Sequence, residues 1–213
     1  MVDLGKLKEE QLKLTKKVVL KDSFNELKLI AGADQAFHND DVISAIVVCD
    51  YKTMEIKEKA YAIVKAKVPY IKGFLAYREG PAISEAYAKL QQKPDVMIFD
   101  GNGILHPRKC GMASHIGVLL DQASIGIAKQ LLIGEVKANK VYVENEARAE
   151  LVETRKHSKP IYVSLGHKIS LKTSVEIVKK CLKFPHKLPE PLHLAHRYAN
   201  EIREKIEKGE IKV

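Results

Sequence analysis

Three acidic residues interrupt otherwise apolar segments: Asp34 in IAGADQAF, Glu79 in AYREGP and Asp100 in VMIFDGNG. A carboxylate in or at the end of a buried strand is costly unless it is paired or binds a metal ion. Carboxylate oxygens suit Mg²⁺, which also takes water and substrate phosphate oxygens as ligands. Bound Mg²⁺ can activate water and stabilise the leaving oxygen of a phosphodiester. The alternative for each residue is a turn-capping role, since Asp-Gly at a strand end is a common turn former.

Several basic side chains could assist such chemistry. Lys129 ends the apolar run SIGIA, where a lysine either extends into solvent or faces the charge that develops on a reacting phosphate. His106, in GILHPRKC, could contact phosphate or metal-bound water. His193 and His196 share a helical face, but no cysteine or further histidine is spaced to complete a zinc site. Taken alone, each histidine is equally typical of an ordinary loop or solvated helix.

The segment Pro69-Tyr70-Ile71 joins a stiff residue, an aromatic ring and an apolar side chain just before Lys72-Gly73. If these side chains are exposed, they form a wedge that can insert between base pairs and hold a duplex open. If Tyr70 is buried, it packs beneath a turn between a strand and a helix.

The composition favours a folded, basic protein. The chain has 213 residues, of which 46% are hydrophobic, with 36 Lys and Arg against 27 Asp and Glu and a net charge of +9. This length suits a single domain over residues 1–213. The charge favours a polyanionic partner such as nucleic acid, although interspersed Lys and Glu also suit a surface rich in ion pairs.

Several features bear on the compartment. No apolar run is long enough to cross a bilayer, and the charged N-terminal segment predicts no signal peptide. Cys49, Cys110 and Cys181 have no paired spacing, as expected for reduced thiols. We therefore expect a cytoplasmic protein without a membrane partner. We expect a monomer, because no apolar surface stripe calls for a second subunit.

Hydrophobic patterning predicts a mixed sheet covered by helices. The expected strands form an antiparallel meander, two buried parallel-type strands and a later strand, over 27–37, 42–50, 54–68, 95–101, 124–128 and 161–167. The expected helices cover 3–20, 74–92, 112–121, 170–181 and 192–208, with a polar hairpin within 134–160. This order is that of the ribonuclease H-like architecture, an α/β fold. It would place the first strand beside the 95–101 strand, and so Asp34 beside Asp100.

Long sequence blocks resemble the endonuclease V family along nearly the whole chain. They are GADQAF, PYIKGFLAYREGP, KPDVMIFDGNGILHPRKCGMASHIG, SIGIAK, VSLGH and PEPLHLAHRYA. The resemblance implies the ribonuclease H-like fold. It also implies an enzyme that hydrolyses the second phosphodiester bond on the 3′ side of deoxyinosine in DNA, leaving a 3′-hydroxyl and a 5′-phosphate. The implied cofactor is Mg²⁺, for which Mn²⁺ can substitute.

The resemblance also implies roles for individual residues. Asp34, Glu79 and Asp100 would be the metal carboxylates and His196 would assist them, while Lys129 would orient or stabilise the nucleophile and phosphate. His106 would support the active site. The residues implied to contact the substrate, in the wedge and in the pocket for a flipped-out base, are Pro69, Tyr70, Ile71, Gly73, Arg78, Gly101, Gly103 and Gly111.

The pocket has a physical rationale, because glycines let backbone N–H and C=O groups approach a base closely. Hypoxanthine differs from adenine at C6 and N1, so these groups can distinguish the two. The wedge departs from the family pattern at Lys72, where a proline is usual, and this departure affects lesion breadth or strand separation. Two alternatives stay open: a structure-specific or inosine-RNA nuclease of the same fold, and a nucleic-acid-binding protein with an inactive site.

Overall fold

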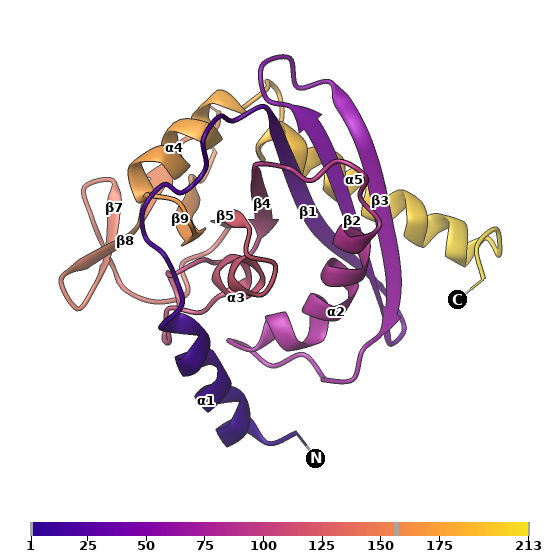
Figure 1. Cartoon of the computed structure of the whole chain (residues 1–213), viewed down its shortest axis with the longest axis horizontal. Helices are drawn as coiled ribbons and strands as arrows, with labels where there is room; N and C mark the ends of the chain where they lie inside the picture. The colour runs from indigo at the N-terminus through magenta and orange to yellow at the C-terminus, as the bar shows by residue number, and fades with distance from the viewer. Residues whose placement is uncertain (1, 156–157, 213) are drawn as a thin grey trace.

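The computed structural model describes residues 2–155 and 158–212, which form one mixed nine-stranded sheet flanked by helices (Figure 1). The strands are β1 (Leu29–His38), β2 (Asp41–Asp50), β3 (Ile56–Lys65), β4 (Val96–Asp100), β5 (Ala123–Ala128), β6 (Glu135–Lys137), β7 (Lys140–Val143), β8 (Glu146–Val152) and β9 (Ile161–His167). They lie in the order β3-β2-β1-β4-β5-β9-β8-β7-β6. The parallel pairs β1–β4 and β4–β5 join the N-terminal meander to antiparallel strands on the other side. The predicted mixed sheet is confirmed.

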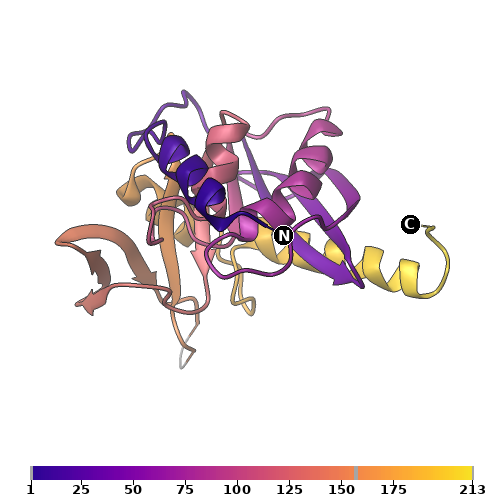
Figure 2. The ribbon, with the colours of Figure 1, turned by 90° about the horizontal axis from the view of Figure 1, so that it is seen from below.

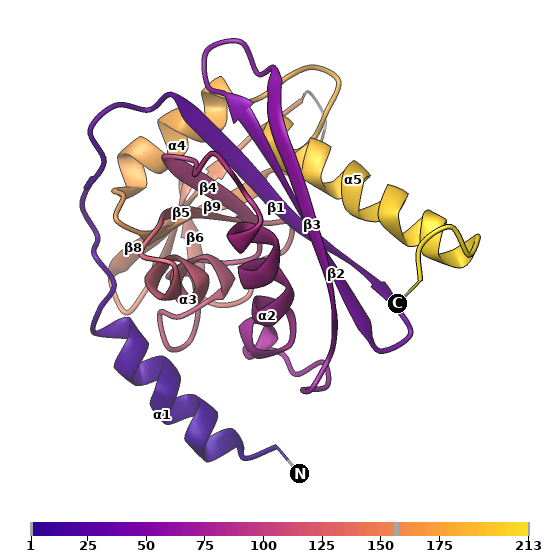
Figure 3. The same ribbon diagram turned by 45° about the vertical axis from the view of Figure 1, so that its right-hand side comes forward.

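Helices cover both faces of the sheet. They are α1 (Leu4–Thr15), α2 (Leu75–Ala88), α3 (Met112–Leu119), α4 (Leu171–Lys180) and α5 (Glu190–Glu207). In Figure 3, α2 and α3 lie in front of the sheet, whereas α5 crosses behind β1, β2 and β3. α1 lies beside α3, outside the sheet layers. Among the residues described, no helix is both long and apolar enough to cross a membrane.

Local interactions explain the meander. Asn39 adopts φ 51° in the two-residue turn between β1 and β2, a left-handed conformation that asparagine tolerates well. Between β2 and β3, the Asp50 carboxylate accepts hydrogen bonds from the backbone N–H groups of Lys52 and Thr53, both at 2.9 Å. Short polar turns of this kind bring consecutive strands into antiparallel register.

Two helices end earlier than the sequence predicts. In each case, the backbone just after the helix forms hydrogen bonds with a residue that is distant in sequence. α1 stops at Thr15, and Val19 N–H then donates to His167 Nδ1 at 3.2 Å at the end of β9. α2 stops at Ala88, and the Glu58 carboxylate accepts from the N–H groups of Gln91 and Gln92 at 2.8 and 2.9 Å. Periodicity within each helix does not reveal these partners.

The Gly80-Pro81 pair does not interrupt α2, which is assigned as helix on both sides of it. Gly80 is buried, and a Cβ there would lie 3.0 Å from Ile116 Cδ1 of α3, so this glycine permits close packing of the two helices. The predicted excursion within 134–160 consists of β6, β7 and β8, which extend the sheet. Figure 2 shows this extension on the side of the molecule opposite the C-terminal end of α5.

Candidate active site

Asp34 and Asp100 lie side by side because β1 and β4 are parallel neighbours. Ala33 pairs with Phe99, so each aspartate is the next residue along its strand. Ala31 and Ala33 pack toward α2, and strand alternation therefore turns Asp34 toward the face that α5 covers. The strand order predicted that Asp34 lies beside Asp100, and this prediction is confirmed.

α5 brings His196 onto Asp34. The two side chains meet through His196 Nδ1 and Asp34 Oδ2, 2.7 Å apart, across 162 residues of sequence. Gly32 makes this possible, because a Cβ there would lie 2.2 Å from the carbonyl carbon and oxygen of Pro191. The N-terminal turn of α5 therefore rests directly on the β1 backbone. A glycine inside a strand is a sequence signal for such close approach, and it was missed at the sequence level.

Glu79 reaches the same region from α2, and its environment disfavours ionisation. Burial, followed by the charges of Asp34 and Asp100, raises the pKa of Glu79 to about 7. Burial and the Asp100 charge likewise raise the pKa of Asp34 to about 6. Each carboxylate thus lies within electrostatic range of the others. Their mutual repulsion in a desolvated site makes the cluster attractive to a cation.

Lys129 places a positive charge beside this cluster. Its Nζ lies 2.6 Å from Asp100 Oδ2. Burial opposes the charged form of the lysine, but the Asp100 charge and hydrogen bond outweigh it and raise the pKa of Lys129. The amine is therefore protonated at neutral pH and half-exposed, which suits a group that meets a substrate phosphate.

The donor set fits a divalent metal ion. Asp34, Glu79 and Asp100 offer hard carboxylate oxygens of the type that Mg²⁺ and Mn²⁺ bind. As the side chains stand, within the described part of the chain no three Asp, Glu, His or Cys side chains lie close enough together to enclose one ion. Lys129 and His196 instead engage two of the carboxylates. The raised pKa values of Asp34 and Glu79 show that negative charge is unfavourable in this site. A bound cation would stabilise the ionised carboxylates.

The segment expected to form a wedge projects from the surface. Tyr70 is 68% exposed and Pro69 is exposed, whereas Ile71 is half-buried. Arg78 of α2 holds the base of this loop by donating from Nη1 to the Val68 carbonyl at 3.0 Å. Its guanidinium also lies 5.5 Å from the centre of the Phe37 ring. Arg78, expected to bind substrate, therefore supports the loop.

A cavity of about 140 Å³ lies between the wedge loop and the glycine-rich loop that follows β4. Tyr70, Gly73, Gly101, His106 and Gly111, all expected site residues, line it. Gly101 directly follows Asp100, so the cavity opens next to the carboxylate cluster. Of the glycines that the resemblance implies for the pocket of a flipped-out base, Gly101 and Gly111 line this cavity.

His106 is buried and uncharged. Burial and then the Arg108 charge lower the pKa of His106 to about 4. His106 Nδ1 accepts from Arg108 N–H at 3.2 Å, so Nε2 carries the proton and donates to the Gly73 carbonyl at 3.1 Å. The residue joins the two loops around the cavity and is well placed as a supporting group.

Gly103 has a different role from the other pocket glycines, because it does not line the cavity. A Cβ on Gly103 would lie 1.9 Å from the Leu165 carbonyl oxygen of β9. Its N–H donates to Ser164 Oγ at 2.8 Å. Gly103 therefore allows the glycine-rich loop to lie directly on the sheet.

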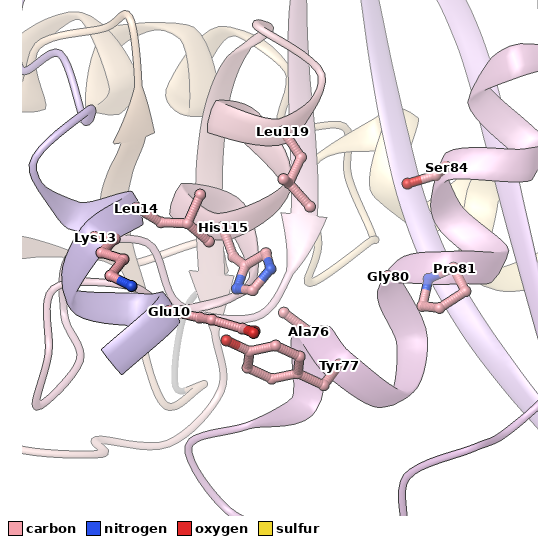
Figure 4. A pocket seen from close by; sticks show the side chains of 10 residues that line it. All are labelled: Glu10, Lys13, Leu14, Ala76, Tyr77, Gly80, Pro81, Ser84, His115 and Leu119. Atoms are coloured by element: carbon pink, nitrogen blue, oxygen red, sulfur yellow. The ribbon is translucent and has the colours of Figure 1, made fainter. Parts of the chain in front are cut away.

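Another cavity, of about 510 Å³, lies between α1, α2 and α3 and has a mostly apolar lining (Figure 4). Tyr77 and His115 meet there edge to face, with ring centres 4.9 Å apart. None of the carboxylates of the candidate site lines this cavity. None of them lines the smaller cavity either, but its lining residue Gly101 directly follows Asp100. The sequence did not predict Gln11 of α1, a buried polar residue that lines this smaller cavity.

Comparisons with known proteins agree with this arrangement. A sequence model of the Endonuclease V family matches residues 12–197 of this chain. Endonuclease V from Dictyoglomus thermophilum is 42% identical over 209 residues, which cover 94% of this chain and 91% of that protein. The crystal structure of Endonuclease V from Bacillus subtilis has a TM-score of 0.90 at 31% identity, covering 98% of this chain and 95% of that one.

A third similar protein is Endonuclease V from Ciona intestinalis, crystallised with a 24mer DNA containing an inosine followed by a ribo-adenosine. It has a TM-score of 0.86 at 31% identity, with 95% of this chain and 98% of that chain covered. The likeness to these structures confirms the predicted ribonuclease H-like fold. The family match spans all the carboxylates, Lys129, His196 and both loops around the cavity, and the chain belongs to the Endonuclease V family.

Proposed function

We propose that this protein is a DNA repair endonuclease that recognises deoxyinosine and hydrolyses the second phosphodiester bond on its 3′ side. The observation that carries the proposal is a cluster of three carboxylates, Asp34, Glu79 and Asp100, with a cavity lined by Gly101, the residue that follows Asp100. A base held there leaves its own strand running past the carboxylates. Family membership and the inosine-containing DNA bound by the Ciona intestinalis relative support the same substrate.

Asp34, Glu79 and Asp100 would hold the divalent cation, for which we propose Mg²⁺ with Mn²⁺ as a substitute. When bound, the ion activates water for attack on phosphorus and stabilises the departing 3′ oxygen. His196 holds the Asp34 carboxylate in one orientation through its 2.7 Å contact. Lys129 carries the charge that can meet the phosphate oxygens beside Asp100.

The wedge and cavity would select the lesion. Exposed Tyr70 can stack on the bases of an opened duplex, and the cavity between Gly73 and Gly101 can take the extruded base. An inosine pair is weaker than a normal pair, which lowers the cost of extrusion. We propose that the protein acts as a monomer, since one chain supplies all these side chains.

The first test is strand cleavage of an end-labelled duplex that carries one deoxyinosine, beside an undamaged duplex of the same sequence. A nick at the second bond 3′ of the lesion, present with Mg²⁺ or Mn²⁺ and absent with EDTA, is the expected result. Equal cutting of the undamaged duplex would instead favour a structure-specific nuclease. Retained binding without any cutting would identify an inactive binding protein.

Asp100→Asn tests the assignment of the cluster. The substitution preserves shape but removes the charge, so cutting should fall by at least about a hundredfold while lesion binding persists. Asp121→Asn is the matched control, because Asp121 is an exposed carboxylate paired with Lys168 outside the cavity. Wild-type cutting by Asp100→Asn would show that Asp100 does not serve the metal.

A second candidate substrate is inosine-containing RNA. The DNA in the Ciona intestinalis complex carries a ribo-adenosine after its inosine, which favours a test of sugar preference. Three strands of one sequence would be compared under single-turnover conditions. One is all DNA, one has ribose only at the residue after inosine, and one is all RNA. Faster cutting of the ribose-containing strands would move the proposed substrate from DNA to RNA.

A further inference from the structure

Gln11 is a buried amide that joins both walls of the cavity described above, although it comes from α1. Its side chain is 1% exposed and lines the cavity. Nε2 donates to the Gly73 carbonyl at 3.1 Å and to the Cys110 carbonyl at 3.2 Å. Gly73 ends the wedge loop, whereas Cys110 lies in the glycine-rich loop. One side chain thus bridges the two loops.

The partners of Gln11 dictate the orientation of its amide. Both N–H bonds of Nε2 are used by carbonyl oxygens, and Oε1 accepts from Arg108 Nε. A reversed amide would direct Oε1 at two carbonyl oxygens and Nε2 at a guanidinium, which offers no acceptor. A buried polar group with every hydrogen bond satisfied specifies one local arrangement. Gln11 therefore defines a single separation between Gly73 and Cys110.

The Gly73 carbonyl is held by three donors in all. Besides Gln11, it accepts from His106 Nε2 at 3.1 Å and from Arg108 Nη2 at 2.8 Å. Gly73 adopts φ +83°, a conformation that its neighbours must hold in place. Thr15 of α1 also donates to the Arg108 carbonyl at 2.6 Å. α1 thus contributes two polar side chains, Gln11 and Thr15, that contact the loops around the cavity.

We propose that Gln11 is a positioning residue for the lesion base, which it serves by holding the walls of the cavity at the separation that a flipped-out base requires. The proposal rests on the function proposed above and adds a residue from outside the sheet to the recognition machinery. Gln11 acts through the backbone at Gly73 and Cys110. Its loss should therefore affect substrates that place a base in the cavity and spare those that do not.

Two variants separate the contacts of Gln11. Gln11→Glu can still accept from Arg108 but has no N–H for the two carbonyls, and Gln11→Met loses all three contacts at similar size. We expect both to raise the Kd for an inosine duplex by about tenfold or more, since both lose the two buried hydrogen bonds that hold the cavity walls. For a duplex with a stable abasic analogue in place of inosine, we expect a change under about twofold. The kinetic loss should appear in KM, with kcat held within about threefold.

Tyr77→Phe is the matched control for weakened docking of α1. Tyr77 OH donates to the Leu7 carbonyl of α1 at 2.9 Å, and Tyr77 does not line the lesion cavity. Thermal unfolding compares the stability of the variants. Tyr77→Phe should lower stability without changing the ratio of inosine to abasic affinity.

Three results would overturn the proposal: equal loss on both duplexes, no loss on either, or the same selective loss in Tyr77→Phe. The function itself has a separate test, because a wild-type protein with no preference for inosine over undamaged DNA would refute the proposed function before any variant is compared. A wild-type preference that survives in Gln11→Glu and Gln11→Met would refute the role of Gln11 alone.

Discussion

Asp34, Asp100 and Glu79 have the same functional group but different neighbours. Asp34 meets His196, and Asp100 meets Lys129. Glu79 forms no ion pair within the described residues and faces the negative charges of the other two. Two of the three charges are therefore partly balanced by the chain itself, and the third is left for a ligand. This division is consistent with a site that binds a cation together with an anionic substrate.

Tyr70→Ala tests the wedge at the scale of one side chain. Tyr70 is largely exposed, so its removal should change the free energy of unfolding by less than about 0.5 kcal/mol. We expect affinity for an inosine duplex to fall by about tenfold, because base–aromatic stacking contributes about 1–3 kcal/mol. Affinity for inosine in a single strand should fall less, since only the duplex must be opened. Fluorescence anisotropy on both substrates measures the difference.

Phe184→Ala is the control for Tyr70→Ala, because Phe184 is also an exposed aromatic residue but lies outside the cavity. It should leave both affinities unchanged. Equal losses on duplex and single strand in Tyr70→Ala would show that Tyr70 stacks on the bases of both substrates alike and would contradict a role in strand separation.

Sequence alone could predict the carboxylates but not every residue around them. Asp34 and Asp100 are conspicuous because each interrupts an apolar strand, and the strand order makes them neighbours. Gln11 carries no such mark, since a glutamine between Glu10 and Leu12 is ordinary in an amphipathic helix. Its significance comes from partners 62 and 99 residues away in sequence, which local patterning cannot reveal.

At the scale of elements, the crossing of α5 over β1 determines how the site is assembled, and Gly32→Ala tests it. The added Cβ would lie 2.2 Å from the Pro191 carbonyl and 2.4 Å from the Leu192 nitrogen. α5 must shift, which should cost about 1–3 kcal/mol of unfolding free energy. Because α5 carries His196, cleavage should also fall by at least about tenfold. Urea denaturation and single-turnover cleavage measure the two effects.

Gly5→Ala is the matched glycine control for Gly32→Ala. Gly5 lies in α1, where the nearest atom to an added Cβ is Asp3 Oδ1 at 3.2 Å, which accepts from Lys6 N–H at the start of the helix and has to shift only slightly. Alanine favours a helix, so this variant should be at least as stable as the wild type. Wild-type cleavage by Gly32→Ala would contradict the role of the α5 crossing.

Periodicity predicted the five helices and the principal strands, because each has an apolar face that local sequence reveals. It failed at boundaries that tertiary hydrogen bonds decide. Glu58 of β3 accepts a hydrogen bond from Gln91 N–H just after α2. His167 of β9 accepts one from Val19 N–H after α1. The three-stranded extension of β6, β7 and β8 was predicted only as a polar hairpin, since its strands are short and each contains charged residues.

At the scale of the whole molecule, the carboxylate cluster couples folding to pH. The pKa of Asp34 is raised to about 6 and that of Glu79 to about 7, so the folded protein holds protons that the unfolded chain has released. Stability from this source is present at acid pH and is lost as pH rises from the unfolded-chain pKa values, 3.8 for Asp34 and 4.5 for Glu79, to the raised values of about 6 and about 7. In EDTA, part of the unfolding free energy should therefore decrease as pH rises across the window between these unfolded and folded pKa values. Mg²⁺ should restore stability above the window by binding the ionised cluster.

Glu79→Gln isolates this component from the other titrating groups. The amide cannot ionise, so the loss of unfolding free energy across the window should be smaller by about 3 kcal/mol, since the pKa of Glu79 is raised from 4.5 to about 7 and one pKa unit corresponds to about 1.4 kcal/mol. Urea denaturation of both proteins on either side of the window, with and without Mg²⁺, provides the comparison. Parallel pH profiles would show that Glu79 is ionised normally in the folded protein.

The contact between His196 and Asp34 also has a consequence for protein synthesis. It closes a loop of 162 residues, and α5 is made long after β1 has left the ribosome. Some chains end before α5, either because synthesis is unfinished or because a protease has cut them. Such a chain carries the three carboxylates but not His196. Because the contact is so distant in sequence, it also closes late in folding. An unfinished copy therefore lacks the side chain that contacts Asp34 in the complete protein.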